Sequence, residues 1–558
     1  MTVDPILFFF DGRAIAARDG QSLAAALTEA GERVFRHTAT GAGRGVFCGM
    51  GVCQDCLLTV DGSPNQRACM TLVTHGSTVL TQVALAVLHA PQVGAVVPAA
   101  RRITPDVLVI GGGAGGLNAA IAAAAAGAGV VVLDERKVAG GQYFKQPAGD
   151  APMLDDQQAE GQALVAKARA SGAEIFGGVD IWGAFDGPLV LAEHLGAALI
   201  VRPKRVIVAT GAYERPHIVP GWTLPGVMTT GAAQTLWRSY RTLPGLRVAV
   251  CGSGPLNLQV ALELACGGAT VALVAEASRS PRLRPMAAMA LAIAGPGLAA
   301  KGLRFLRGLG QRRVAVHYDT RLQSVVREKG ALRATFRDAG GRETHVTVDA
   351  LCMNDGFEPQ NEILRLLGAD MQLDPVFGHL RCTRDAMLQT TVPGVYAVGD
   401  CAGLGGAPAA AVEGRIAGRA AAASLGKTAL HGIARLQAEL ARHRRFQARL
   451  WSLYAPAPHS LATTPDDTII CRCEEVTLGE VREGLLAAPC HSGTLKRLTR
   501  VGMGRCQGRY CGAVAARLVS GMTGQPIDNY SHFAPRVPIK PVSIATILAA
   551  QSALDDLT

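Results

Sequence analysis

Aromatic residues are scarce in this chain, because Phe, Trp and Tyr make up 5% of its 558 residues. Charged residues are also few, at 18%, and the sequence has no block of five or six like charges and no basic run interleaved with aromatic residues. The formal net charge is +11 and the pI is near 9.1. Without a basic cluster this charge does not favour nucleic-acid binding, and it indicates a solvated arginine-rich surface or an acidic partner protein.

Long uninterrupted apolar runs are missing too. Residues 119–133 are too short to span a bilayer, and residues 81–100 are broken by Pro91, Gly94 and Pro98. The first residues carry neither the basic segment nor the small-residue cleavage site of a secretory signal. We therefore expect a cytoplasmic protein that is not integral to a membrane, either free or peripheral at the inner membrane. Thiols stay reduced in that compartment, so the 14 cysteines are expected to be ligands or buried side chains rather than disulfides.

The chain is long and rich in apolar residues and glycine, with 49% hydrophobic residues and 66 glycines. This is enough for several domains that each bury a core. A strand, a Gly-rich turn, a helix and a second strand follow one another from Asp106, and the same order begins again at Arg247. Apolar strand signals return near Leu351. The sequence therefore predicts an α/β multidomain protein with two dinucleotide-binding, Rossmann-like units, the second inserted into the first.

Four cysteines near the N-terminus have the spacing C-x4-C-x2-C-x12-C. The first three match the plant-type spacing for a [2Fe-2S] cluster, and glycines between them let the backbone bend around such a cluster. Zinc is the alternative, although zinc ligands usually come as paired C-x2-C elements. The predicted cluster ligands are Cys48, Cys53, Cys56 and Cys69.

A second set near the C-terminus has the spacing C-x-C-x32-C-x4-C. Its ligand count suits a second metal centre, and the spacing alone leaves zinc open. The predicted ligands are Cys471, Cys473, Cys506 and Cys511. The other six cysteines form no C-x2-C or C-x4-C pair near a flavin motif, so a redox-active disulfide is not expected.

The first glycine motif predicts an FAD site. Its G-x-G-x-x-G turn joins a strand to a helix whose N-terminus can face a pyrophosphate. Two acids at the end of the next strand can accept hydrogen bonds from ribose hydroxyls. Later matches in the same order are GGQ, ATG and TVPGVYAVGD. The last of these resembles the second FAD motif of flavoproteins with two dinucleotide-binding domains, and that resemblance implies that its final acid contacts the ribityl chain of FAD. The predicted FAD-binding residues are Gly111, Gly113, Gly116, Asp134, Glu135, Gly141, Gln142, Thr210, Gly211 and Asp400.

The second glycine motif is less complete. Gly252 and Gly254 keep the turn, but Asn257 stands at the third glycine position. The residue 23 positions after Gly252 is Ala275, and Glu276 follows it, so a ribose contact of NAD is doubtful. Arginines just beyond could bind a phosphate of NAD(P) or of ATP, or could simply be solvated. Both possibilities stay open.

Several motifs also resemble known families. The segment with VFCGMGVCQDC is similar to the β-grasp ferredoxin domain, and IICRCEEVTLGEV with GMGRCQGRYCG resembles the bacterioferritin-associated type of [2Fe-2S] domain. The order of GGGAGGLNAA, ATGAYERP, GSGPLNL, VYAVGD and CRCEEVT resembles the flavoprotein subunit of opine oxidases, hydrogen cyanide synthase and dye-linked proline and hydroxyproline dehydrogenases, and part of the sarcosine oxidase alpha subunit.

The domain plan combines these motifs and resemblances. We expect residues 1–95 to form the β-grasp domain, 104–244 and 351–430 the two parts of the FAD domain, 245–350 the second nucleotide domain, 431–465 a helical linker, 466–530 the C-terminal [2Fe-2S] domain and 531–558 a tail.

This resemblance implies a heteromeric complex, in which a smaller FAD subunit of the amino-acid-oxidase type oxidises the substrate. The present chain would then pass electrons through FAD and two [2Fe-2S] clusters to a quinone or an electron carrier. The substrate would be a secondary amine such as proline, hydroxyproline or an opine. Two alternatives stay open: a self-sufficient NAD(P)H-dependent flavoprotein reductase, and a non-catalytic, nucleotide-bound assembly subunit. We find no persuasive nucleophile and base pair, so no catalytic residue is predicted.

Overall fold

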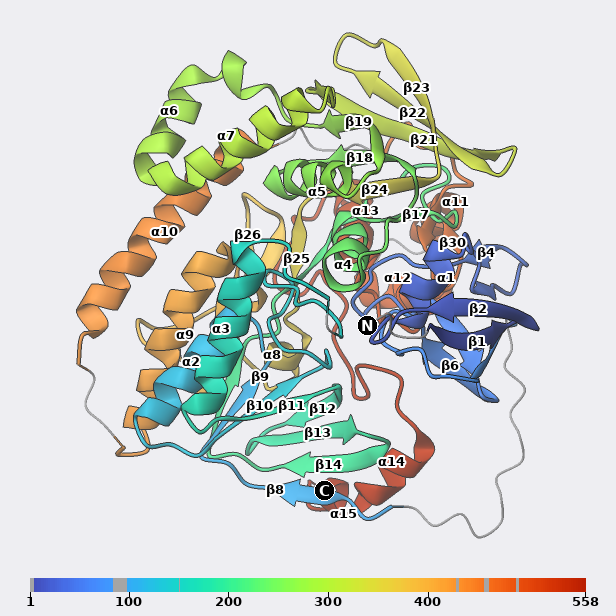
Figure 1. Cartoon of the computed structure of the whole chain (residues 1–558). Helices are drawn as coiled ribbons and strands as arrows, with labels where there is room; N and C mark the ends of the chain where they lie inside the picture. The colour runs from blue at the N-terminus through green and yellow to red at the C-terminus, as the bar shows by residue number, and fades with distance from the viewer. Residues whose placement is uncertain are drawn as a thin grey trace.

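A computed structural model describes residues 5–83, 98–149, 151–427, 431–455, 461–487 and 491–557, and Figure 1 gives its element labels. The N-terminal domain is built on a mixed sheet with the strand order β2-β1-β7-β5-β6, in which β1 runs parallel to β7. Asp11 and Gly12 both have positive φ angles, as a tight two-residue hairpin requires. The elements of this domain are β1 (Ile6–Phe10), β2 (Arg13–Ala17), α1 (Leu23–Glu29), β3 (Arg36–His37), β4 (Gly43–Arg44), β5 (Leu57–Val60), β6 (Ser63–Arg67) and β7 (Thr78–Thr81).

The first nucleotide unit has a parallel sheet with the order β11-β10-β9-β15-β28. Its central strands are buried on both faces, which explains their continuous apolar sequences. Helices α2 and α9 pack closely because glycines meet backbone: a Cβ added at Gly414 would lie 2.1 Å from the Gly115 oxygen. The elements are β9 (Val107–Ile110), α2 (Ala114–Ala125), β10 (Val130–Asp134), α3 (Asp156–Ala170), β11 (Glu174–Gly177), β15 (Arg205–Val208), β28 (Val395–Ala397) and α9 (Gly406–Ala423).

The second nucleotide unit lies between β15 and β28 in the sequence, as an insertion in the first unit. Its sheet has the order β17-β24-β18-β19-β20. Strand β17 lies before residues 245–350 and β24 extends beyond them, yet both join this sheet, so the expected boundaries of the second domain are too narrow. Apolar strand signals do not tell which of two neighbouring sheets a strand will join. The elements are β17 (Val227–Thr229), α4 (Thr230–Tyr240), β18 (Arg247–Gly252), α5 (Pro255–Cys266), β19 (Thr270–Glu276), α6 (Pro285–Ala294), α7 (Pro296–Gln311), β20 (Val316–His317), β21 (Thr320–Glu328), β22 (Ala331–Asp338), β23 (Glu343–Val348) and β24 (Ala350–Asn354).

Smaller sheets flank the two units. One has the order β12-β13-β14-β8, and a short pair joins β16 to β25. The elements are β8 (Arg101–Ile103), β12 (Val179–Phe185), β13 (Leu189–His194), β14 (Ala197–Val201), β16 (Ala212–Glu214), β25 (Phe357–Pro359), α8 (Glu362–Leu366), β26 (Met371–Asp374) and β27 (His379–Cys382).

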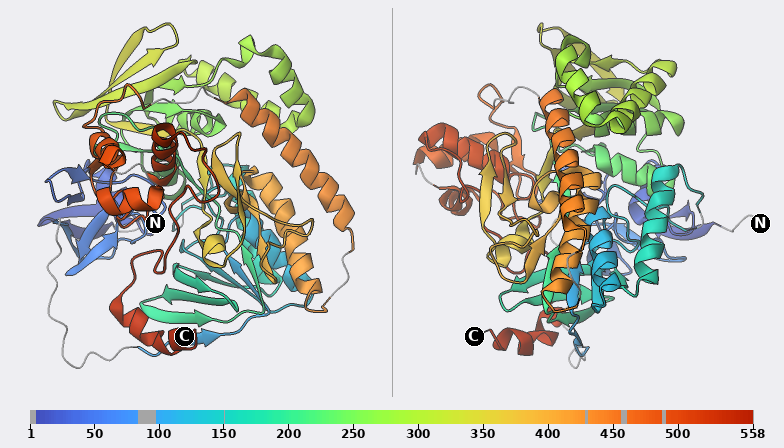
Figure 2. Two further views of the ribbon diagram at one scale, coloured as in Figure 1. Left: turned by 180° about the vertical axis from the view of Figure 1, so that it is seen from behind. Right: turned by 90° about the vertical axis from the view of Figure 1, so that its left-hand side faces the viewer.

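Helix α10 (Ile433–Leu453) confirms the predicted linker helix, with Leu436 and Leu440 buried. It runs beside α9 and reaches α6 (Figure 2). The C-terminal module comprises β29 (Ile469–Cys471), β30 (Val476–Thr477), α11 (Leu478–Ala487), α12 (Ser492–Thr499) and α13 (Gly512–Thr523).

The expected tail is in fact folded. Its helices α14 (Ile544–Ala549) and α15 (Gln551–Asp555) lie beside β14 (Figure 1), where Ala550 and Ala553 pack in one cluster with Trp182. The sequence pattern did not predict this packing, because small apolar residues such as Ala550 and Ala553 give no signal for the sheet that they cover.

One hydrophobic core joins three parts of the chain. It contains Phe47 and Cys48 of the N-terminal domain, Trp222 from the segment between the two nucleotide units, and Cys506 and Tyr510 of the C-terminal module. Within the described ranges, no helix is both long and apolar enough to cross a membrane.

Candidate redox centre

Three of the N-terminal cysteines lie in the loop between β4 and β5, Cys69 follows β6, and all four are buried. They form two pairs of thiols in contact, Cys48 with Cys53 and Cys56 with Cys69. Burial opposes ionisation of Cys48, but hydrogen bonds from the Cys53 thiol and from backbone N–H groups outweigh it and lower the pKa of Cys48 to about 7. A thiolate is the form that binds a metal. The contact that favours the Cys48 thiolate raises the pKa of Cys53, so one thiol of this pair ionises before the other.

The C-terminal cysteines repeat this arrangement. Cys471 contacts Cys511, and Cys473 contacts Cys506. The hydrogen bond from Cys511, against the cost of burial and with help from backbone N–H groups, lowers the pKa of Cys471 to about 7. The structure therefore brings the cysteines of each predicted set into two pairs, although 32 residues separate Cys473 from Cys506 in the sequence.

Pairs of thiols favour one kind of metal centre. Across the described ranges, no three His, Cys, Asp or Glu side chains converge as they would around a single ion. A structural zinc ion needs four ligands on one metal, whereas a [2Fe-2S] cluster takes two thiolates at each of its irons. Each set offers two thiol pairs, one for each iron of such a cluster.

Three buried hydrogen-bond donors in the region of the cysteines have no acceptor among the described residues. Arg44 Nε, Arg472 Nη1 and Tyr510 Oη are buried and have no hydrogen-bond partner in the described part of the protein. Native proteins leave few such groups unpaired, and the sulfur atoms of a cluster accept hydrogen bonds. The residues present therefore fit an inorganic cluster.

The two cysteine sets touch each other. The Sγ atom of Cys473 lies 3.9 Å from the carbonyl oxygen of Cys53. Asp55, fully buried between two N-terminal ligands, pairs with Arg36 at 2.7 Å and also with Arg472, which stands between Cys471 and Cys473. The contact between Cys473 and Cys53 and the buried ion pairs of Asp55 thus join the two cysteine sets.

The FAD motif folds as its glycines predict. Gly111 has a φ of +107°, and a Cβ there would lie 2.4 Å from the Ala209 oxygen. Gly116 could not carry a Cβ either, because it would lie 1.8 Å from the Gly111 oxygen. A Cβ at Gly113 would meet no atom closer than 3.8 Å, where the Cα of Gly141 lies. Space is therefore left at the glycine turn, as close approach of a pyrophosphate requires.

The two acids after β10 differ in their contacts. Asp134 accepts hydrogen bonds from the N–H groups of Gly112, at 2.5 Å, and Arg136, at 2.7 Å. Glu135 instead pairs with Arg67 of the N-terminal domain, at 2.7 Å, and with Lys540, at 2.6 Å. A ribose contact by Glu135 would have to displace an ion pair, so Asp134 is the better candidate.

Three later residues of the predicted FAD site lie outside the helices and strands of the main sheet: Thr210 and Gly211 join β15 to β16, and Asp400 lies in a short 3-10 helix, Gly399–Ala402. Thr210 donates to the Gln360 oxygen at 2.6 Å, and a Cβ at Gly211 would meet nothing within 4 Å. Asp400 accepts the N–H groups of Gly405 and Gly406, both at 2.8 Å, at the start of α9. These residues hold the loops that the FAD prediction assigns to the cofactor.

Gln142 leads to a residue that the sequence analysis missed. Its carbonyl accepts a hydrogen bond from the Lys145 ammonium at 3.0 Å, and Gln234 accepts another at 2.9 Å. Burial lowers the pKa of Lys145 to about 7. A lysine near GGQ has no spacing signal, so only the fold marks it as a buried, titratable group.

In the second nucleotide unit the acid is one residue later than the count suggested. A register shift between Val248 and Ala249 in the pairing of β18 with β19 places Glu276 opposite Gly252. Glu276 accepts the N–H groups of Gly254, at 3.0 Å, and Ser278, at 2.9 Å. Burial raises the pKa of Glu276 to about 7. Glu276 therefore stands in the position that Asp134 has in the first unit.

The rest of this second site is partly filled by the chain. Asn257 accepts a hydrogen bond from Thr230, at 2.8 Å, and donates to the Asn354 oxygen, at 3.1 Å. Ser253 donates to the Tyr454 oxygen at 2.7 Å. Of the arginines beyond β19, Arg284 donates to the carbonyls of Ser452 and Leu453. The end of α10 therefore covers the second glycine turn.

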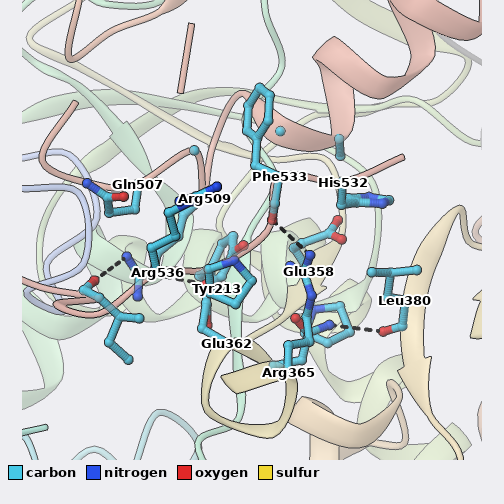
Figure 3. Close-up of a pocket in the computed structure, with 17 residues that line it drawn as sticks. Tyr213, Glu358, Glu362, Arg365, Leu380, Gln507, Arg509, His532, Phe533 and Arg536 are labelled. Atoms are coloured by element: carbon cyan, nitrogen blue, oxygen red, sulfur yellow. Dashed lines mark hydrogen bonds and ion pairs between the residues drawn. The ribbon is translucent and has the colours of Figure 1, made fainter. Parts of the chain in front are cut away.

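A small cavity lies between the C-terminal module and the FAD unit (Figure 3). Arg509 pairs with Glu362 at 3.0 Å, and Arg365 donates to the Phe533 oxygen at 2.8 Å. The cavity volume is about 40 Å³, which suits water rather than an amino-acid substrate. The contacts around it fasten the module to the FAD unit.

Comparison with known families assigns three segments. Residues 3–84 match the 2Fe-2S iron-sulfur cluster binding domain, residues 105–423 the pyridine nucleotide-disulphide oxidoreductase family, and residues 469–551 the sarcosine oxidase A3 domain. The first two matches confirm the ferredoxin-like head and the Rossmann-like units. The third does not confirm the expected bacterioferritin-associated type of domain at the C-terminus.

Individual relatives give the same picture. The chain is 32% identical over 453 residues to the A subunit of opine oxidase from Rhizobium meliloti, covering 79% of this chain and 98% of that protein. It is 32% identical over 359 residues to the HcnB subunit of hydrogen cyanide synthase from Pseudomonas aeruginosa, covering 61% and 75%. The L-proline dehydrogenase of P. horikoshii shares the fold, with a TM-score of 0.73, 22% identity and 98% coverage of both chains.

Proposed function

The chain belongs to the family of the opine oxidase A subunits and to the pyridine nucleotide-disulphide oxidoreductases, and from this we propose that it is the electron-transferring subunit of a heteromeric amine dehydrogenase. It is an oxidoreductase with an FAD-type unit and a 2Fe-2S domain. In the proposal, a partner FAD subunit oxidises a secondary amine such as proline, hydroxyproline or an opine, and this chain passes the electrons to a quinone or an electron carrier.

The observation that carries the proposal is the contact between the two cysteine sets beside the FAD unit. Tyr213 follows Gly211 of the ATG motif by two residues, and its ring centroid lies 5.5 Å from that of Tyr510. Tyr510 in turn lies 5.3 Å from Phe47, next to Cys48. Buried aromatic rings therefore connect the FAD unit with both cysteine sets, and a flavin that takes up two electrons can pass them on singly to an iron–sulfur cluster.

We propose a second [2Fe-2S] cluster on Cys471, Cys473, Cys506 and Cys511. Its support is the pairing of thiols and the lowered pKa of Cys471. Iron and acid-labile sulfide analysis of the full chain tests this: we expect four irons per chain, falling to two in a Cys473→Ser, Cys506→Ser variant. Zinc at this set, or two irons in both proteins, would contradict it.

A self-sufficient NAD(P)H reductase is the second candidate, because Glu276 stands at the ribose position of a dinucleotide fold. The covering of the glycine turn by Tyr454 and the replacement of the third glycine by Asn257 favour the electron-transfer subunit instead. The third candidate is a non-catalytic assembly subunit that binds ATP without turnover. The mixing experiment below distinguishes it as well.

Anaerobic mixing separates these functions. With NADH or NADPH alone, we expect no flavin bleaching at catalytic rates, whereas the partner subunit with its amine substrate should bleach both flavin and cluster absorption. Rapid bleaching by NADPH or NADH would establish the reductase and exclude the electron-transfer subunit as proposed. Tight ATP binding without any reduction by substrate would favour the assembly subunit.

The partner needs a docking surface, and α6 with α7 supplies a candidate. Residues 277–318 contain eight basic and no acidic residues, although the whole chain has a net charge of only +11. Helix α6 exposes an apolar stripe, with Met286 80%, Met289 60% and Ile293 75% exposed. Such a stripe beside arginines fits a partner surface that is apolar at its centre and acidic at its rim. We propose that the amine-oxidising subunit binds here.

A further inference from the structure

The hydroxyl of Tyr510 is a buried donor without an acceptor. The residue is 4% exposed, and within the described residues no hydrogen-bond partner reaches its Oη atom. Buried hydroxyls are rarely left unpaired, because they lose their hydration without compensation. The unpaired group therefore indicates an acceptor that is not a protein atom.

The surroundings of Tyr510 show where that acceptor lies. Its backbone precedes Cys511 of the C-terminal set, but its ring packs edge-on against Phe47, with 5.3 Å between ring centroids and 75° between planes. Phe47 immediately precedes Cys48. The buried core around Tyr510 contains cysteines of both sets, but those that act most on its hydroxyl are Cys48 and Cys53, ahead of Cys506. The phenol therefore belongs to the environment of the N-terminal cysteines.

Contacts on both sides hold the ring there. Tyr213 lies against it at 5.5 Å. Arg472, which like Tyr510 belongs to the C-terminal module, stacks on Phe47, with 3.6 Å between its guanidinium carbon and the ring centroid. Arg472 also pairs with Asp55. These contacts fix the C-terminal module over the loop that carries Cys48, Cys53 and Cys56.

We propose that the Tyr510 hydroxyl donates a hydrogen bond to a sulfur atom of the iron–sulfur cluster in the N-terminal domain, so that the C-terminal module sets the reduction potential of that cluster. A donated hydrogen bond stabilises the more negative, reduced cluster and raises its potential. The inference needs neither the second cluster nor the proposed amine substrate, because it concerns the domain that the 2Fe-2S family match identifies.

The test compares Tyr510→Phe with Tyr213→Phe in the full-length holoprotein. Both changes delete one phenolic hydroxyl from neighbouring rings of the same core. The potential of the N-terminal cluster is measured by redox titration followed by electron paramagnetic resonance, and its signal is identified by the change that Cys69→Ser causes. We expect Tyr510→Phe to lower the reduced-to-oxidised ratio at fixed potential roughly tenfold, about 59 mV for one electron, and Tyr213→Phe to leave it unchanged.

Two results would overturn the inference: an unchanged potential in Tyr510→Phe, or an equal shift in both variants, which would show a packing effect. If Tyr510→Phe does not fold with its cluster, 3-fluorotyrosine introduced at position 510 keeps the ring and the hydroxyl but makes the hydroxyl a stronger donor. We then expect a higher potential than in the wild type. No shift in this protein would equally refute the hydrogen bond.

Discussion

At the scale of single residues, Asp55 shows how a charge joins distant parts of the chain. It stands between two N-terminal cysteines and forms ion pairs with both Arg36 and Arg472 in a fully buried position. A buried ion pair is expensive to break from one side, because the remaining charge stays buried without a partner. Asp55 therefore matters more to the assembly of the core than any exposed ion pair.

We expect Asp55→Ala to lower the free energy of unfolding by about 3–5 kcal/mol, since two buried guanidinium groups lose their counter-charge. Glu32→Ala is the control, because its partner Arg13 is largely exposed and their ion pair contributes little. Thermal unfolding followed by circular dichroism gives the comparison, and limited proteolysis reports release of the C-terminal module. Equal melting temperatures for the two variants would refute this role of Asp55.

At the scale of elements, a one-residue register shift changes how the second nucleotide unit is understood. The count of 23 residues from Gly252 ends at Ala275, but the irregular pairing of β18 with β19 brings Glu276 to the end of the strand. Its carboxyl is buried, and its pKa is raised to about 7 by that burial. The folded chain therefore holds this proton more tightly than the unfolded chain does.

A pH dependence follows from this difference. The stabilising contribution of protonated Glu276 is fully present below about pH 4.5 and is lost as pH rises through about 7. We expect Glu276→Gln to remove this loss, so that its stability relative to wild type grows between pH 4.5 and 7.5 by on the order of 3 kcal/mol at most. Urea unfolding at a series of pH values measures it. Parallel stability curves for the two proteins would contradict the raised pKa.

At the scale of the whole molecule, α6 and α7 form a corner away from the cysteine sets (Figure 1). This corner combines the apolar stripe on α6 with a segment, 277–318, that has eight basic and no acidic residues. A partner that binds there would leave the redox core of this chain intact. Binding and cofactor content can therefore be separated by mutation.

We expect Met286→Glu combined with Ile293→Glu to weaken binding of the amine-oxidising subunit at least tenfold, because two carboxylates enter the apolar stripe. Flavin and iron content should stay unchanged. The matched control is Leu195→Glu, which alters an isolated residue that is 88% exposed. Binding of purified subunits is measured by light scattering at low and high salt. Unchanged affinity of the double variant, or binding of wild type only to anionic lipid vesicles, would exclude this docking surface.

Local features of the fold were predictable from the sequence. The Asp11-Gly12 hairpin and helix α10 both depend on residues close together in the chain. The glycine turn at Gly111 and the fourfold cysteine spacings belong to the same class. Their geometry is set by covalent spacing and backbone sterics, so they can be recognised without knowledge of tertiary contacts.

The sequence by itself therefore determined the types of units in this protein and the residues that each unit offers to its cofactor. Tertiary structure alone decided how the units meet: Cys53 touches Cys473 across 420 residues, and Glu135 joins Arg67 to Lys540. Such contacts depend on how whole domains pack, and no local pattern encodes them. Burial then gives a side chain a role that its sequence neighbours do not indicate, as Asp55 and Tyr510 show, and it lowers the pKa of Lys145 to about 7.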